Sequence, residues 1–181
     1  EFSLDSCSPY GLSKITQERF AKLYREQYGM KNTVSGHLII LVLDNPTDLL
    51  YQAGAGKWRY YLQKKRMDNI IVGNIDVYRD FSDVRDVVRA YRMILKAKKS
   101  KTIYNVGSGK ATKLKDILDY IVSLSSCKIS IEIDPSLVRN GENAKIYCCN
   151  ELIRKDLGWY PQYDISDTVK DIYEYYYNMF T

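Results

Sequence analysis

The sequence predicts an α/β fold, because segments typical of strands alternate with segments typical of helices along most of the chain. Short apolar runs indicate buried strands, and longer stretches with apolar residues every three or four positions indicate amphipathic helices. The chain has 181 residues, of which 45% are hydrophobic and 27% charged. That is enough for one sizeable domain or the larger part of a two-lobed one, and it does not favour disorder.

The first predicted helix covers residues 10–28, begins after Pro9 and ends at Gly29, a residue that commonly follows the last turn. Residues 34–44 form an apolar run that indicates one buried strand. Residues 45–67 show no clean period, so no regular element is predicted there.

Regular patterns return at residues 69–74, which indicate a short strand and a turn, and at 83–98, which indicate an amphipathic helix. Thr112 is the expected N-cap of the next helix, and Gly158 ends a later one. One side of the 83–98 helix is expected to carry Val84, Val87, Val88, Tyr91, Ile94 and Leu95. The remaining predicted elements are a strand at 102–106 that leads into the turn 107–109, a helix at 112–124, a strand at 128–133, and helices at 151–157 and 166–177.

Composition excludes several classes of protein. Lys and Arg number 27 against 22 Asp and Glu, a net charge of +5 that suits a phosphate-bearing ligand without indicating nucleic acid. The cysteines lack a CxxC spacing and His37 is the single histidine, so no ordinary zinc site is expected. No apolar stretch approaches the roughly 20 residues needed to span a membrane, and the first residues lack the pattern of a signal peptide. A cytoplasmic protein with reduced thiols is therefore expected.

Tyr10 and Lys14 form a candidate catalytic pair. Four residues apart on a helix, they share one face, so the ammonium can stabilise the phenolate and lower a pKa that is ordinarily near ~10. Such a tyrosine can donate a proton to a carbonyl oxygen while a hydride arrives at carbon, and the lysine can also bind a cofactor ribose. The same spacing at Tyr60–Lys64 and Tyr61–Lys65 shows that composition alone can produce it.

The flanking Ser8, Pro9 and Ser13 make this pair resemble the catalytic element of the extended short-chain dehydrogenase/reductases. The segment YRDFSDVRDVVRAY at 78–91 resembles the members of that family that reduce 4-keto-6-deoxy sugars carried on GDP. Several motifs in the family's order are far more specific than any one of them. The shorter matches are VGN at 72–74, YNVGSG at 104–109, DPSLVR at 134–139 and DLGWYP at 156–161.

The resemblance implies an NAD(P)H-dependent reductase that converts GDP-4-keto-6-deoxy-mannose to GDP-rhamnose and acts as a homodimer. It implies that Tyr10 and Lys14 are catalytic and contact the cofactor. It places Arg79 and Arg139 on the nucleotide diphosphate, which suits a guanidinium fork that stays charged. Glu142 sits where an acidic partner for the nucleotide ribose is common.

The resemblance also implies a division of the chain. Residues 1–44 would be a remnant of the cofactor-binding Rossmann-like domain, a parallel sheet with helices. Residues 69–181 would be the small nucleotide-sugar-binding lobe, with the strand at 102–106 returning to the Rossmann sheet. The Gly-rich cofactor loop and the third catalytic residue are expected before Glu1. The chain as given is therefore expected neither to bind NAD(P) tightly nor to turn over.

Residues 33–67 do not fit the family, which has an Arg-Pro-Phe-Asn-His-Thr-Gly-Pro segment there. Read one base out of register, permitted codons for residues 37–48 spell Phe-Asn-His-Thr-Gly-Pro-Gly-Gln-Ser-Asp-Arg-Phe. Our hypothesis is a pair of compensating frameshifts, entering near Thr33 and leaving near Met67. Residues 45–68 are accordingly interpreted as an irregular, out-of-frame segment.

Two alternatives stay open. One is GDP-mannose 4,6-dehydratase or another nucleotide-sugar epimerase or dehydratase, although Phe81 resembles the reductases better because dehydratases tend to carry tryptophan there. The other, of a different class, is a non-catalytic nucleotide- or nucleic-acid-binding module built on the basic, aromatic stretch 57–66.

Overall fold

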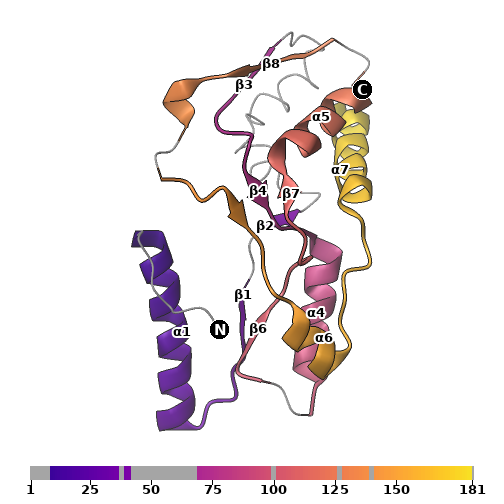
Figure 1. Ribbon diagram of the computed structural model, residues 1–181. Coiled ribbons are helices and arrows are strands. Elements are labelled where there is room, and N and C mark those ends of the chain that lie inside the picture. Colours follow the sequence, from indigo (N-terminus) through magenta and orange to yellow (C-terminus); the bar gives the residue numbers. More distant parts are fainter. Residues whose placement is uncertain are drawn as a thin grey trace.

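A computed structural model describes residues 9–36, 39–41, 69–98, 101–125, 128–138 and 141–180. The irregular block at 45–68 lies outside this range, and so does Arg139. The predicted α/β class is confirmed, since helices alternate with short and mostly parallel strands (Figure 1). The helices described are α1 (Pro9–Tyr28), α4 (Val84–Lys96), α5 (Leu114–Leu124), α6 (Glu151–Leu157) and α7 (Ile165–Phe180), with a short 3-10 turn at Pro135–Leu137.

Within the described ranges, four small sheets connect distant parts of the chain. β1 pairs with β6, β2 with β5 and β3 with β8, all in parallel, while β4 lies between β7 (antiparallel) and β9 (parallel). The strands are β1 (Val34–Gly36), β2 (Ile39–Leu41), β3 (Asn69–Val72), β4 (Tyr78–Arg79), β5 (Phe81–Asp83), β6 (Ile103–Asn105), β7 (Thr112–Lys113), β8 (Ser130–Ile133) and β9 (Lys145–Ile146).

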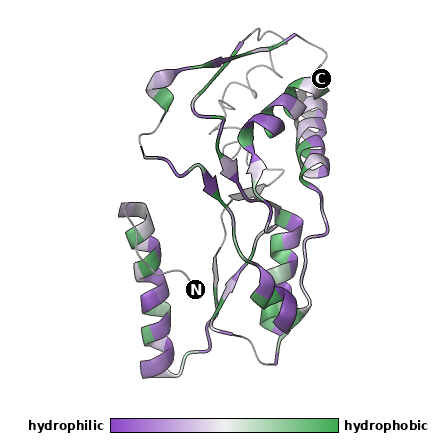
Figure 2. Ribbon diagram, viewed as in Figure 1, coloured by the Kyte–Doolittle hydropathy of each residue, from purple (hydrophilic) through white to green (hydrophobic). Residues whose placement is uncertain are grey.

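The N-terminal helix agrees with the sequence prediction. α1 covers Pro9–Tyr28, and Gly29 follows it in the left-handed region with φ +64°. Figure 1 shows α1 on one side of β1 and β6, with α4 and α6 on the other. Apolar and hydrophilic residues are mixed along the length of α1 (Figure 2), and several large apolar side chains of this helix are exposed.

The prediction of a buried strand at 34–44 is confirmed only in part, as strand structure that is divided between two elements. Two short strands occur there instead, and each has a different partner: Val34 is opposite Ile103, whereas Ile39 is opposite Phe81. The β1 residues are only half-buried. A run of apolar residues identifies strand-forming sequence, but it carries no information about where the chain changes partner.

Two apolar clusters form the core. The first cluster joins β3, β5, α5 and α7. The second cluster joins α4, β6 and α6, and Trp159 belongs to it. Their fully or almost fully buried members include Ile70, Val72, Val77, Phe81 and Leu118 in the first, and Val87, Ala90, Tyr104, Val106, Ile153 and Trp159 in the second.

Helix α4 begins one residue later than predicted, because Asp83 is its N-cap and accepts a hydrogen bond from the Arg85 amide. Its predicted buried side is partly wrong. Val87 and Ile94 are buried together with Ala90, whereas Leu95 is 86% exposed. The difference follows from packing, since the helix meets β6 and α6 along the row that Val87, Ala90 and Ile94 form. Val88 and Tyr91, also on the predicted side, are exposed as well.

The predicted cap at Thr112 is wrong too. Thr112 belongs to β7, where it pairs with Arg79, and α5 begins at Leu114 without a side-chain cap. The first amide groups of α5 are satisfied differently, because Leu114 donates to the Val77 carbonyl and Lys115 to the Ile75 carbonyl.

The strands predicted at 69–74, 102–106 and 128–133 are confirmed within two or three residues. The predicted helix at 151–157 is confirmed, with Gly158 in the left-handed region at φ +67°, and α7 extends the one predicted at 166–177. None of the helices described is long and apolar enough to cross a membrane.

Candidate functional site

The candidate site is built around β4, whose two residues lie between β7 and β9. Arg79 is opposite Thr112 on one side and Ile146 on the other. The next residue, Asp80, leaves the strand and is completely buried. β4 and its continuation therefore supply a partly buried cation followed directly by a completely buried anion.

Arg79 forms an ion pair with Glu142. Its Nη2 donates to the Glu142 carboxylate over 2.7 Å, and its Nη1 donates to the main-chain carbonyls of Tyr78 (2.8 Å) and Asn143 (2.9 Å). The two side chains are 14% and 26% exposed. The guanidinium is therefore held by three acceptors, and a small part of the side chain is still accessible to solvent. The structure thus brings together two residues that the sequence singled out 63 positions apart.

Asp80 anchors two loops to the strand that carries Arg79. One of its oxygens, Oδ1, accepts from the amide (2.8 Å) and the hydroxyl (2.6 Å) of Ser108. The other, Oδ2, accepts from the amides of Gly109 (2.9 Å) and Cys148 (3.2 Å). A buried carboxylate is costly unless hydrogen bonds satisfy it, and these four donors do so. Sequence reasoning missed this role, although Asp80 lies within the segment that carries the family resemblance.

Packing explains the glycines of the turn that Asp80 binds. A Cβ on Gly107 would lie 2.5 Å from the Cys148 Sγ, too close for any side chain. Gly109 has φ +74°, a conformation that favours glycine. Asn150, buried at the start of α6, donates to the Gly107 carbonyl over 2.8 Å. The two glycines therefore allow the turn after β6 to pack closely against the residues that precede α6.

Cys148 is an unreactive thiol by position. Burial raises its pKa to about 12, and the neighbouring Asp80 carboxylate adds to the increase. Cys149 is exposed. Since the thiolate is the nucleophile, only about 10⁻⁴ of Cys148 would be reactive near pH 8.

We expect a thiol reagent to modify Cys149 in the native protein and to leave Cys148 unmodified. Cys149→Ser should remove one fast-reacting thiol from a spectroscopic titration, and Cys148→Ser should remove none. Equal rates for the two cysteines in the folded protein would contradict this assignment.

Asp83 binds the first turn of α7, and Asp86 holds the loop between α6 and α7. The Asp83 carboxylate accepts from Arg85 and from the Thr168 hydroxyl (2.8 Å). Asp86, 2% exposed, pairs with Arg89 and accepts from the amides of Gln162 (3.0 Å) and Tyr163 (3.1 Å). The indole of Trp159 donates to the main-chain carbonyl of Asp86 over 3.0 Å. These acidic residues are structural, and the amphipathic pattern of α4 gave no sign that Asp86 is buried.

The predicted catalytic pair lies in a different part of the molecule. Tyr10 and Lys14 are one turn apart in the first part of α1, and Lys14 is exposed. The Tyr10 side chain lies outside the described part of the structure. Figure 1 shows α1 beside β1, on the opposite side from α4 and α6, so the pair belongs to a different element from the strand β4 that carries Arg79.

Comparison with known proteins identifies the family. The family model described as GDP-mannose 4,6 dehydratase matches residues 1–172. The chain belongs to this family. The predicted relationship to the extended short-chain dehydrogenase/reductases that act on nucleotide sugars is therefore confirmed.

Curated relatives carry different activities. The chain is 24% identical to GDP-6-deoxy-D-mannose reductase of Pseudomonas aeruginosa over 91% of its own length and 54% of the relative. It is 31% identical to a putative UDP-glucose 4-epimerase of Methanocaldococcus jannaschii over 93% of its length and 53% of the relative. The chain spans about half the length of the curated relatives it matches.

Solved structures share the fold. RMD from Pseudomonas aeruginosa, solved in complex with NADPH, has a TM-score of 0.84 at 22% identity and covers 97% of this chain and 58% of its own. UDP-glucose 4-epimerase from Thermotoga maritima, solved with UDP-glucose, has a TM-score of 0.79 at 20% identity, with coverages of 98% and 56%. These likenesses confirm the predicted fold.

Proposed function

We propose that this protein reduces a GDP-linked 4-keto-6-deoxyhexose with NAD(P)H in the cytoplasm, converting GDP-4-keto-6-deoxy-mannose to GDP-rhamnose. The observation that carries the proposal is the contact between Arg79 and Glu142. The family resemblance assigns Arg79 to the diphosphate and Glu142 to the ribose of the same nucleotide. Two residues with these roles must lie next to each other, as Arg79 and Glu142 do.

Arg79 is suited to bind a diphosphate because hydrogen bonds fix its side chain in position. Its guanidinium is held by two main-chain carbonyls and Glu142, so little side-chain entropy is lost when an anion binds. A planar fork can also contact two phosphate oxygens at once. We propose Arg139, three residues before Glu142, as the second cation of this clamp.

The helical placement of Tyr10 and Lys14 supports their proposed catalytic role. Residues four apart on α1 share a face, so the Lys14 ammonium can stabilise the Tyr10 phenolate and contact the cofactor ribose. When bound, the nicotinamide supplies the hydride. Tyr10 would then hold and deliver the proton that the substrate oxygen requires.

The pairing of β1 with β6 supports the proposed division of the chain. We assign residues 1–44 to the cofactor-binding domain and 69–181 to the sugar-nucleotide lobe, with 102–106 returning to the first domain's sheet. Exposed apolar side chains on α1 support a homodimer that buries this helix. They include Leu12 (59% exposed), Phe20 (54%) and Tyr28 (71%).

A second candidate is a lyase or epimerase reaction on the same scaffold. Two observations favour it, the description of the matched family as a 4,6 dehydratase and the 31% identity to a putative UDP-glucose 4-epimerase. Phe81, buried at the start of β5, supports the reductase only because the reductases resemble this chain at that position, where dehydratases tend to carry tryptophan.

We propose that the 181-residue chain alone does not turn over, so the test is a substrate panel with the protein expressed from its own gene. We expect GDP-4-keto-6-deoxy-mannose to be reduced with loss of NADPH absorbance. Tyr10→Phe should lower kcat by about 10²–10⁴-fold with little change in KM. Tyr24→Phe, on the same helix, is the matched control and should leave kcat unchanged. Conversion of GDP-mannose or of a UDP-hexose without net NADPH consumption would instead establish the dehydratase or the epimerase.

A further inference from the structure

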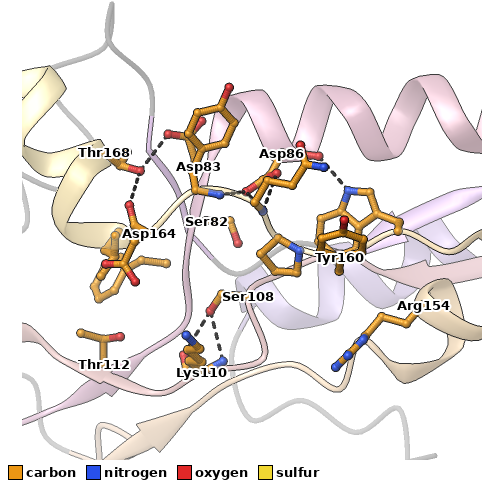
Figure 3. A pocket seen from close by; sticks show the side chains of 16 residues that line it. Ser82, Asp83, Asp86, Ser108, Lys110, Thr112, Arg154, Tyr160, Asp164 and Thr168 are labelled. Atoms are coloured by element: carbon orange, nitrogen blue, oxygen red, sulfur yellow. Dashed lines mark hydrogen bonds between the residues drawn. The ribbon is translucent and has the colours of Figure 1, made fainter.

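A cavity of about 400 Å³ lies near β4 but is lined by neither Arg79 nor Glu142. It is enclosed by β5, the first turn of α4, the segment 108–112, α6 and the loop between α6 and α7 (Figure 3). Its volume falls within the range of small-molecule sites, roughly 300–1,000 Å³. None of the residues assigned to the proposed reaction lines it.

The acidic residues of the cavity are already bound within the protein. Asp83 accepts from Arg85 and Thr168, and Asp86 from Arg89 and two main-chain amides. Asp164 accepts from the amide (3.0 Å) and the hydroxyl (2.7 Å) of Ser166. Arginines neutralise the first two carboxylates, so the cavity is not an acidic site.

Ser82 provides the clearest sign of a ligand. It is 7% exposed and lines the cavity, and Figure 3 shows its hydroxyl directed toward the interior. Within the described part of the chain this hydroxyl has no hydrogen-bond partner. Its oxygen is not among the fully buried side-chain atoms that lack a partner, so it is accessible from the cavity and offers an unused donor and acceptor there. The half-buried Thr112 contributes a second hydroxyl from β7.

Two exposed cations, Lys110 and Arg154, line the same cavity. Arg154 extends from α6 toward the segment that carries Ser108 and Lys110 (Figure 3). Among the described residues, neither Arg154 nor Lys110 has a carboxylate within ion-pair distance. Among the described lining residues, Asp164 is the carboxylate that no arginine neutralises. Hydrogen bonds from Ser166, and to a smaller extent charge attraction by Lys110, lower its pKa. Lys110, Arg154 and Asp164 together therefore leave one net positive charge. An oxyanion placed between Lys110 and Arg154 would gain charge-assisted hydrogen bonds from both sides.

We propose that this cavity is a second binding site, for a small hydroxylated oxyanion such as a sugar phosphate or a sugar acid. The anionic group lies between Lys110 and Arg154, and the hydroxyl groups reach Ser82 and Thr112. The exposed ring of Tyr160 at the rim covers the apolar face of the sugar. The site shares no lining residue with the proposed nucleotide site. The two are neighbours, because Thr112 pairs with Arg79 across β7 and β4 and Ser108 is hydrogen-bonded to Asp80.

Calorimetric titration of the 181-residue chain with glucose 6-phosphate, gluconate, inorganic phosphate and glucose tests the site. We expect saturable binding of one of the two hydroxylated anions, weaker binding of inorganic phosphate and none of glucose. Whichever of glucose 6-phosphate and gluconate binds more tightly shows whether the site prefers a phosphate or a carboxylate. Arg154→Gln should weaken binding about tenfold or more, whereas the matched control Lys155→Gln, one position along α6, should not change it.

Ser82→Ala separates the hydroxyl contact from charge attraction. It should lower the affinity for the hydroxylated anion several-fold and leave the affinity for inorganic phosphate unchanged. Equal affinities in Arg154→Gln and Lys155→Gln, or no saturable binding, would overturn the proposal. Loss of binding in Arg79→Ala alone would also overturn it, by placing the anion at the nucleotide site.

Discussion

Replacing Asp80 with asparagine should lower the free energy of unfolding by about 2–4 kcal/mol, although the new side chain has almost the same shape. Both carboxylate oxygens accept two hydrogen bonds, and three of the four donors are main-chain amides. Whichever oxygen the asparagine NH₂ group replaces, at least one main-chain N–H group loses its acceptor and faces another donor. Each hydrogen bond to a buried charged group contributes about 1.5–3 kcal/mol, so the loss exceeds that of an average substitution.

Urea denaturation of the wild type and Asp80→Asn measures this loss. Asp119→Asn is the matched control, because Asp119 is half-exposed and pairs with Lys115 one turn away on the surface of α5. The control should change the unfolding free energy by no more than about 0.5 kcal/mol. Coincident unfolding curves for Asp80→Asn and the wild type would show that the buried carboxylate does not join the two loops to β4.

Helices were the most predictable part of the fold, because their ends depend on local chemistry. Gly29 and Gly158 follow α1 and α6 in the left-handed conformation that favours glycine, and both helix ends were predicted correctly. Helix starts depended more on tertiary structure. Thr112 is a good N-cap residue by type, yet its pairing with Arg79 in β7 decides its conformation.

Strand pairing and helix orientation were not predictable in this way. Nothing in the apolar run at 34–44 shows that β1 joins β6 while β2 joins β5. Likewise, the periodicity of α4 permitted a face that included Leu95, and only the positions of β6 and α6 select the face with Ala90.

The candidate site was predictable where recognition needs a particular side chain. Arg79 and Glu142 were identified through the family resemblance, and the structure places them 2.7 Å apart. Asp80, Asp86 and Ser82 were not identified, because their importance comes from burial and from partners far along the chain. An aspartate next to an arginine, or within a helix of alternating charges, is usually a solvated residue.

Arg79→Ala should weaken GDP binding by about 10–100-fold, which corresponds to roughly 1.5–3 kcal/mol for the loss of charge-assisted hydrogen bonds to a phosphate. The fold should tolerate the change, because Glu142 is partly exposed and can be hydrated once its partner is gone. Arg79→Lys keeps the charge but loses the planar fork, so an intermediate affinity is expected. Arg92→Ala, an exposed arginine on α4, is the matched control and should bind GDP as the wild type does.

The most direct test of the central claim is therefore a calorimetric titration of the 181-residue chain with GDP, carried out in parallel on the wild type, Arg79→Ala and Arg92→Ala. The proposed sugar-nucleotide site predicts saturable GDP binding that Arg92→Ala retains and Arg79→Ala weakens by at least about tenfold. Wild-type protein that does not bind GDP, or equal GDP affinity in all three proteins, would contradict the assignment of Arg79 and Glu142 as its core.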